Sequence, residues 1–289
     1  MLSFHSKIKN MITVNSLSGG KTSSYLAANY PADFNVFALV RTSDKECMFP
    51  DKKIRQIVSD KIGIEFIGTL EDDMIIYTML DLEQYIGKKI YWVTGKTFDE
   101  VISNKKGYLP CLFSRFCTVE MKIEPLYHWW KNNFTEPIEM RIGFRANEQK
   151  RVLNSIKKSD INGFQTFKDI VGQSKNGRNK WKQIAWQKQT FPLVNDRVFK
   201  DKIVEFWKDK EVRFAISNNC VGCFHRNEVN LNYMSKINPI KFNWFVNQEI
   251  KTNKTFINGI TYDKIRKYQF QKELSFEDFT ECDSGYCGL

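Results

Sequence analysis

The sequence lacks any apolar run long enough to cross a membrane, and its first residues lack the apolar core of a signal peptide. These two absences lead us to expect a cytoplasmic protein with no membrane partner. In that compartment its seven cysteines are expected to be thiols, metal ligands or redox groups and not disulfides. At 289 residues, with 42% hydrophobic and 27% charged residues, the chain can form a sizeable folded core.

Acidic residues are too few to balance the basic ones. The chain has 33 Asp and Glu against 44 Lys and Arg, which gives a net charge of +11 and a pI of about 9.2. A basic balance favours polyanionic partners such as DNA or RNA. A lysine-rich proteome would produce the same balance, so both explanations stay open. The composition gives no indication of the oligomeric state.

The chain also lacks the first glycine of a P-loop, G-x-x-x-x-G-K-[ST], because Asn15 stands where that glycine would be. A different glycine turn is present between residues 11–17, which read as a strand, and residues 22–29, which read as a short helix. Such a turn places backbone N–H groups at a helix N-terminus, where they suit a phosphate. The turn consists of Ser18, Gly19, Gly20, Lys21, Thr22 and Ser23.

The residue types in this turn fit an anion. The two glycines allow positive φ angles and a close approach of a ligand to the backbone. Lys21 adds a positive charge, and three hydroxyl side chains can donate to phosphate oxygens. The competing interpretation is an ordinary glycine turn with an exposed lysine.

Apolar runs alternate with helical patterns along the first half of the chain, which predicts an α/β fold with a mostly parallel, five-stranded sheet. The expected strands are residues 11–17, 34–41, 64–67, 89–93 and 139–144. Helices are expected at residues 22–29, 51–62, 72–85, 98–102, 126–133, 200–208, 227–237, 239–251 and 262–274. We divide the chain into a nucleotide-binding domain (1–154), a basic insertion or hairpin (155–198) and a helical C-terminal region (199–289).

Three segments of the chain resemble one protein family. The turn at residues 18–23 is similar to the S-G-G-x-[DT]-S loop of the PP-loop, or N-type ATP pyrophosphatase, superfamily. Residues 115–125 match the R-x-C-T-x-x-x-K-x-x-P segment of PAPS reductase-like proteins, and residues 143–151 match their G-[IF]-R-x-[DN]-E-x-x-R pattern. The matching positions of the second segment are Arg115, Cys117, Thr118, Lys122 and Pro125.

The resemblance implies an adenine nucleotide alpha-hydrolase-like, Rossmann-like fold that binds ATP or PAPS, with Mg2+ if the nucleotide is ATP. It implies catalytic roles for Lys21, Arg115, Lys122 and Arg145. Nucleotide-binding roles fall on Ser18, Gly19, Gly20, Lys21, Thr22, Ser23, Thr42 and Arg151. Chemically, such cations can neutralise charge on a phosphate or sulfate. A solvated basic face, or ordinary i, i+3 pairing on a helix, would give the same residues.

The C-terminal third carries a Cys-x-x-Cys turn, Cys220 and Cys223, and a later pair, Cys282 and Cys287. Four thiolates suffice for a closed zinc site or a [4Fe-4S] cluster, and we expect Gly222 to leave room for the metal. Phage and bacterial PAPS reductase-like proteins look similar here.

The other cysteines are less informative. Cys111 and Cys117 can be packed thiols, metal ligands or nucleophiles, and Lys45 can lower the pKa of Cys47.

The resemblance therefore predicts a nucleotide-dependent sulfur transfer, with nucleic acid as a candidate acceptor. A true PAPS reductase, which releases sulfite, is the first alternative. Its E-C-G-L-H tail is only partly matched, because Tyr286 precedes Cys287 and the sequence stops at Leu289. A non-catalytic nucleic-acid-binding or defence-system component is the second alternative.

Residues 155–190 are strongly basic and include Trp181 and Trp186. Basic residues with interspersed aromatics suit a single-stranded nucleic acid or a phosphate backbone. A solvated insertion with a β-hairpin near residues 183–191 explains the composition equally well.

Overall fold

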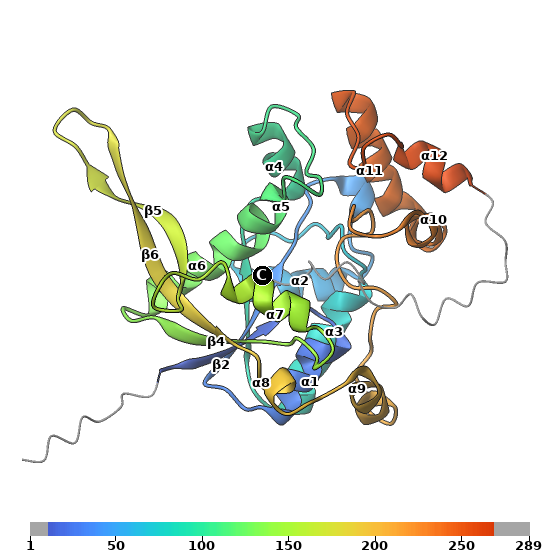
Figure 1. Cartoon of the computed structure of the whole chain (residues 1–289). Coiled ribbons are helices and arrows are strands. Elements are labelled where there is room, and N and C mark those ends of the chain that lie inside the picture. The colour runs from blue at the N-terminus through green and yellow to red at the C-terminus, as the bar shows by residue number, and fades with distance from the viewer. Residues whose placement is uncertain (1–10, 269–289) are drawn as a thin grey trace, which may run out of the picture.

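The computed structural model describes residues 11–268, which form an α/β protein built on one six-stranded sheet (Figure 1). The strands are β1 (Thr13–Leu17), β2 (Phe34–Leu39), β3 (Ile90–Thr94), β4 (Ile138–Ile142), β5 (Gln165–Gln173) and β6 (Asn179–Thr190). Their order is β3-β2-β1-β4-β6-β5, and all neighbours are parallel except β5 and β6. The predicted mostly parallel α/β fold is confirmed.

The number of strands differs from the predicted five. Residues 64–67 do not form a strand, because their backbone pairs with the loop after β2: Phe49 N–H donates to the carbonyl of Ile67, and Gly68 bridges Thr42 and Met48. The basic stretch instead supplies β5 and β6, a longer hairpin than the one predicted near residues 183–191. A short apolar run by itself does not separate a sheet strand from an extended loop segment.

Helices pack on both faces of the sheet, which is why β2 is buried along nearly its whole length. On one face, α1 (Lys21–Asn29), α3 (Met74–Ile86) and α9 (Lys200–Trp207) pack against Phe37 and Leu39. On the other face, α6 (Glu124–Asn133) packs Trp130 against Val36 and Met140. Outside the C-terminal group lie also α2 (Lys52–Ile62), α4 (Phe98–Asn104), α5 (Phe116–Thr118), α7 (Gln149–Ile156), α8 (Pro192–Asn195) and the short η1 (Lys45–Cys47) and η2 (Val119–Ile123).

A second core lies among the C-terminal helices, α10 (Glu228–Ile237), α11 (Pro239–Thr252) and α12 (Tyr262–Lys267). Phe245 and Tyr262 pack there with Phe98 of α4 and with Val40, just after β2. This core fixes the C-terminal region against the carboxyl edge of the sheet. The helix predicted at 262–274 ends earlier than expected, at Lys267, and residues beyond 268 lie outside the described chain.

Within residues 11–268, no helix has both the length and the apolar character that crossing a membrane requires. The division into three parts stays a prediction. β6, from the segment that we assigned to an insertion, pairs with β4 in the same sheet as β1.

Candidate functional site

The glycine turn lies at the carboxyl end of β1, the edge at which open α/β sheets hold their ligands. Gly19 has a φ of +79°, a conformation that favours glycine. A Cβ on Gly19 would also stand 2.5 Å from a methyl carbon of Ile75 in α3. Glycine is therefore needed here both for the backbone angle and for the packing.

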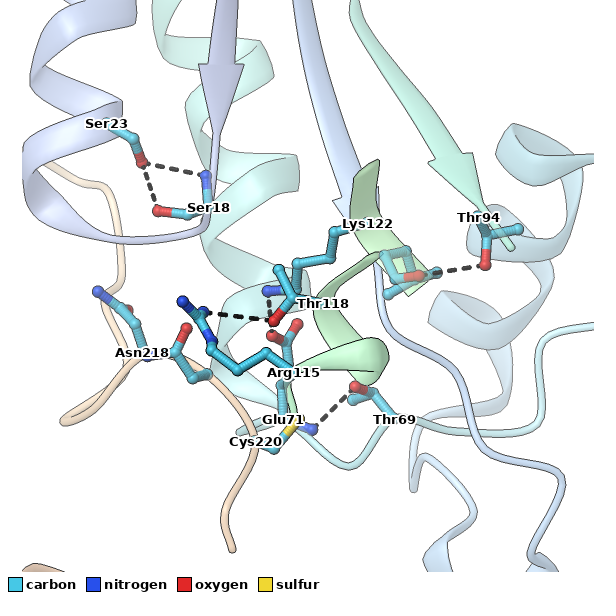
Figure 2. A network of polar contacts seen from close by, with 12 residues as sticks. Ser18, Ser23, Thr69, Glu71, Thr94, Arg115, Thr118, Lys122, Asn218 and Cys220 are labelled. Carbon is cyan, nitrogen blue, oxygen red and sulfur yellow. Dashed lines mark hydrogen bonds and ion pairs between the residues drawn. The ribbon is translucent and has the colours of Figure 1, made fainter. Parts of the chain in front are cut away.

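Hydrogen bonds inside the turn fix its shape. The backbone N–H of Ser18 donates to Ser23 Oγ over 3.2 Å, and the two hydroxyl oxygens are 3.1 Å apart (Figure 2). The buried Ser23 hydroxyl donates to the carbonyl of Gly20 over 3.1 Å. Ser23 thus orders the turn from within. The first backbone N–H groups of an α-helix have no intrahelical acceptor. At α1 the N-cap residue is Gly20, which has no side chain to cap them.

Lys21 is the first residue of α1, and its carbonyl accepts a hydrogen bond from the indole N–H of Trp207 over 3.0 Å. Its ammonium group lies 5.9 Å from the centre of the Phe214 ring. The side chain lines a pocket that it shares with three more lysines, Lys200, Lys208 and Lys210. The turn therefore opens onto a strongly cationic pocket between α1 and α9.

A second pocket is lined by Arg115 and Lys122 and by no residue of the turn itself. Arg115 immediately precedes α5 (Phe116–Thr118), and Lys122 lies in η2 (Val119–Ile123), which follows α5 and continues into α6. The η2 part is wider than an α-helix, and such π turns are frequent at functional sites. Lys122 pairs with Glu71 at 2.9 Å, and Arg115 donates to the Thr118 hydroxyl at 3.4 Å.

The sequence analysis missed Glu71. Its side chain is only 1% exposed and lines the same pocket as Arg115 and Lys122. One carboxylate oxygen binds Lys122, and the other has no hydrogen-bond partner among the described residues. A buried carboxylate oxygen without a donor is costly, so this oxygen faces a position where a ligand group would be stabilising. The acidic run at residues 71–73 was the only signal in the sequence, and it shows no spacing that marks a site.

Asn218 was also missed, and it connects the two pockets. A Cβ on Gly20 would overlap the amide group of Asn218, so the 217–220 segment packs directly on the glycine turn. Asn218 lines the Lys21 pocket, and the next residue, Asn219, lines the Arg115 pocket. Arg226 holds this segment, since its buried guanidinium donates to the carbonyl of Asn218 over 2.5 Å. Figure 2 shows Asn218 and Arg115 in one view with Ser18, Ser23 and Glu71.

The Cys-x-x-Cys turn lies at the far side of the Arg115 pocket, which Cys117 and His225 also line. Burial raises the pKa of Cys220 well above its usual value, and the neighbouring Glu71 carboxylate adds to the effect. Burial likewise raises the pKa of Cys117 to about 11 and lowers that of His225 to about 4. Without a cation, these groups are neutral thiols and a neutral imidazole at pH 7.

Our explanation for Gly222 is wrong. A Cβ at this position would overlap the ring of Phe245, so glycine is required by packing in the C-terminal core and not by space for a metal. Within residues 11–268, no three metal-ligating side chains form a group that could hold a metal ion. The predicted four-cysteine site therefore needs Cys282 and Cys287, which lie outside the described residues.

Two other predicted site residues follow β4. Gly143 packs on the turn, because a Cβ there would lie 3.1 Å from the Cα of Ser23. Arg145 comes two residues later, and both Arg145 and Arg151 pair with Glu148, at 3.3 and 2.5 Å. The Arg151 guanidinium also stacks on Phe144 at 4.3 Å. Glu148 therefore pairs with both arginines, but neither arginine lines either of the two pockets.

Thr42 does not line either pocket. It is buried, and its hydroxyl donates to Asp99 over 2.7 Å. The suggestion that Lys45 lowers the pKa of Cys47 is wrong, since burial raises that pKa to about 12. Cys111 is half-buried and lines neither pocket; its backbone forms an isolated β-bridge with that of Ser114.

Comparison with known proteins gives few matches. No family model matches the chain, and no curated protein matches it. Among solved structures, the chain is similar to phosphoadenylyl-sulfate (PAPS) reductase from Candida auris in a phosphate complex. The TM-score is 0.36 and the identity 8%, over 72% of this chain and 76% of that one.

The chain is also similar to the U34-tRNA thiolase NcsA from Methanococcus maripaludis, solved with its [4Fe-4S] cluster. Here the TM-score is 0.38 and the identity 16%, over 92% of this chain and 77% of that one. TM-scores and identities this low do not show to which family the chain belongs or what activity it has. The chain itself is an α/β protein with a glycine turn at the carboxyl edge of its sheet and two pockets that Asn218 and Asn219 connect.

Proposed function

We propose that this protein is an enzyme that binds ATP or PAPS through the turn at residues 18–23 and acts at the phosphate end of the nucleotide. One observation carries the proposal: the turn leads into the N-terminus of α1 beside a pocket with Lys21, and the Asn218–Asn219 segment that packs on the turn connects this pocket to the one with Arg115 and Lys122. Backbone donors at a helix N-terminus and convergent cations form a site for a phosphate chain.

With ATP, an acceptor oxygen attacks the α-phosphorus, the bond to the bridging oxygen breaks, and pyrophosphate leaves. The cations of the site stabilise the negative charge that moves onto the leaving group. A sulfur nucleophile then displaces AMP from the adenylated acceptor, so that sulfur replaces oxygen there. We propose nucleic acid as the acceptor, in keeping with the net charge of +11.

Mg2+ would accompany ATP and shield its phosphate charge. Glu71 fits as the residue that helps to hold it, because one of its carboxylate oxygens is unpartnered and lines the pocket. For a zinc ion or a [4Fe-4S] cluster, Cys220 and Cys223 supply two thiols, which is too few for a closed site within residues 11–268. We propose that Cys282 and Cys287 complete it.

The test is pyrophosphate exchange into ATP by Lys21→Ala. We expect the rate to fall about 100-fold or more, the usual effect of losing one group that stabilises a developing charge. Lys52→Ala, which removes an exposed lysine from α2, is the control for net charge and should retain the parent rate. An unchanged rate in a folded Lys21→Ala variant would remove Lys21 from the site. Release of sulfite from PAPS in parallel assays, dependent on Cys287, would instead identify a reductase.

A further inference from the structure

The β5–β6 hairpin extends beyond the sheet to which it belongs. Only residues 187–190 of β6 pair with β4. β5 and β6 pair with each other over a longer stretch, from the pair Gln165–Gln187 to the pair Gln173–Asn179. The rest of β6, eight residues from 179 to 186, is about 26 Å of two-stranded ribbon, and no third strand from residues 11–268 pairs with it. Figure 1 shows this ribbon reaching away from the body of the molecule. We call residues 165–186 the arm.

The arm carries five exposed basic side chains, Lys168, Lys175, Arg178, Lys180 and Lys182. Within residues 11–268, none of the five forms an ion pair. The one acidic residue of the arm, Asp169, is bound by Lys131 at 2.6 Å and by the Tyr127 hydroxyl at 2.8 Å, both from α6. The exposed part of the arm therefore presents uncompensated positive charge.

These cations are spread over both faces of the ribbon. Lys168 lies over the ring of Trp181 at 5.4 Å, which places both side chains on one face. Because successive side chains alternate between faces, Lys180 and Lys182, the neighbours of Trp181 in sequence, point to the opposite face. Lys175 and Arg178 belong to the turn at the tip, where the backbone N–H of Ser174 donates to the carbonyl of Arg178 over 2.8 Å.

From this arrangement we propose that the arm binds duplex DNA as a two-stranded ribbon in the major groove. The major groove of B-DNA admits such a ribbon, and the groove has a phosphate backbone on each side. Exposed cations along the ribbon and at its tip bring positive charge to the phosphates that flank the groove. The narrow major groove of an RNA duplex does not admit side chains in this way.

The burial of the aromatic rings favours a duplex over a single strand. A single strand is held by stacking its bases on successive exposed aromatic rings. On the arm, Trp186 is 1% exposed and Phe167 stacks on Tyr127 at 4.4 Å, so both rings are used by the core. Trp181, 54% exposed, is the one ring of the arm that solvent reaches well, and Lys168 covers part of it.

The arm leaves the sheet at the edge opposite the glycine turn. β6 runs parallel to β4, so residues 179–186 extend past the amino end of β4, whereas the turn follows the carboxyl end of β1. The arm therefore anchors DNA and does not place the reacting group. This DNA binding does not depend on the proposed nucleotide chemistry.

The experiment measures the anisotropy of a fluorescein-labelled 24-base-pair DNA duplex with the full chain and no nucleotide, between 50 and 200 mM KCl. If all five cations meet phosphates, affinity falls several hundred-fold over this range. The double variant Lys180→Gln/Lys182→Gln should reduce that salt effect by about tenfold and bind more weakly at 50 mM. The control, Lys52→Gln/Lys53→Gln, removes the same charge from exposed positions of α2 and should bind as the parent does.

Equal weakening by the arm variant and the α2 control would mean that net charge alone binds DNA, and it would overturn the proposal. Tighter binding of single-stranded DNA or of duplex RNA by the parent protein would overturn it without any variant. A change in oligomeric state with unchanged DNA affinity would identify the arm as a contact between copies of the chain instead. Lys21→Ala should bind DNA normally, so failure of the proposed chemistry stays distinguishable.

Discussion

The glycine turn at residues 18–23 and the β5–β6 arm both combine glycine with lysine, but tertiary contacts enclose the glycines of only one of them. In the turn, Gly19 and Gly20 face Ile75 and Asn218 so closely that neither position has space for a Cβ. In the arm, Gly172 and Gly177 have no atom within 4 Å of a Cβ position. The turn also has one lysine and a buried serine, whereas the arm has five exposed cations and one neutralised carboxylate.

This difference indicates two ways of holding an anion. A fixed backbone directs a few N–H groups at one small anion, and its binding depends on geometry. A charged ribbon binds a polyanion through the number of its contacts, and its binding depends on ionic strength. A substitution that alters shape should therefore damage the turn most, and one that alters charge should damage the arm most.

The largest expected difference compares two glycines with similar φ angles. Gly19 has φ +79° and Gly177 has φ +72°, but only Gly19 is enclosed. We expect Gly19→Ala to lower the free energy of unfolding by about 3 kcal/mol, from backbone strain and overlap with Ile75. Gly177→Ala should cost about 1 kcal/mol, from strain alone. Urea denaturation of both variants measures this, and equal losses would show that the turn is not held by its surroundings.

A smaller difference is expected between two carboxylates, one beside the turn and one at the root of the arm. Glu71→Gln removes a 1% exposed carboxylate from Lys122 and should cost about 2 kcal/mol. Asp169→Asn removes the partner of Lys131, a half-exposed lysine, and should cost less than about 1 kcal/mol. Chemical denaturation at pH 7 compares them. If Asp169→Asn lowered the free energy of unfolding more than Glu71→Gln, the arm and not the turn would be the region that depends more on its tertiary contacts.

The smallest effect is a dependence on pH at the root of the arm. Hydrogen bonds from Lys131 and Tyr127 hold the pKa of Asp169 below its usual value of 3.8. A pKa depressed by folding stabilises the protein above the unfolded value, and this contribution is lost as pH falls through the folded value. The stability gap between the parent and Asp169→Asn should therefore be full at pH 6 and shrink below pH 3.8. A gap that is constant down to pH 3 would contradict the ion pair.

Local patterns in the sequence predicted most of the helices and four of the five expected strands. The segment at 64–67 was misread, because its apolar residues pack against the loop after β2 and its length does not distinguish the two cases. For the basic stretch at 155–190 the sequence left two explanations open, and Trp186 is buried against Tyr127 and Trp130 of α6, where it cannot stack on a base.

The predicted cations lie in three separate groups, since Arg145 and Arg151 pair with Glu148 and line neither pocket. Arg115 and Lys122 share a pocket because Arg115 immediately precedes the irregular helical run that carries Lys122, which their spacing in sequence already suggested. Lys21 faces a different pocket, formed by α9 and residues 212–218, almost 200 positions later in the chain. No local pattern connects segments that far apart.

The sequence alone determined the alternation of strands and helices and the position of a glycine turn after the first strand, because hydrophobic period and glycine placement act over a few neighbouring residues. Only the tertiary structure decided that Asn218 closes over that turn, that Glu71 meets Lys122, and that Cys117 lies in the same pocket as Cys220. These contacts join segments about 50 to 200 residues apart, and they form only when the C-terminal core packs against the carboxyl edge of the sheet.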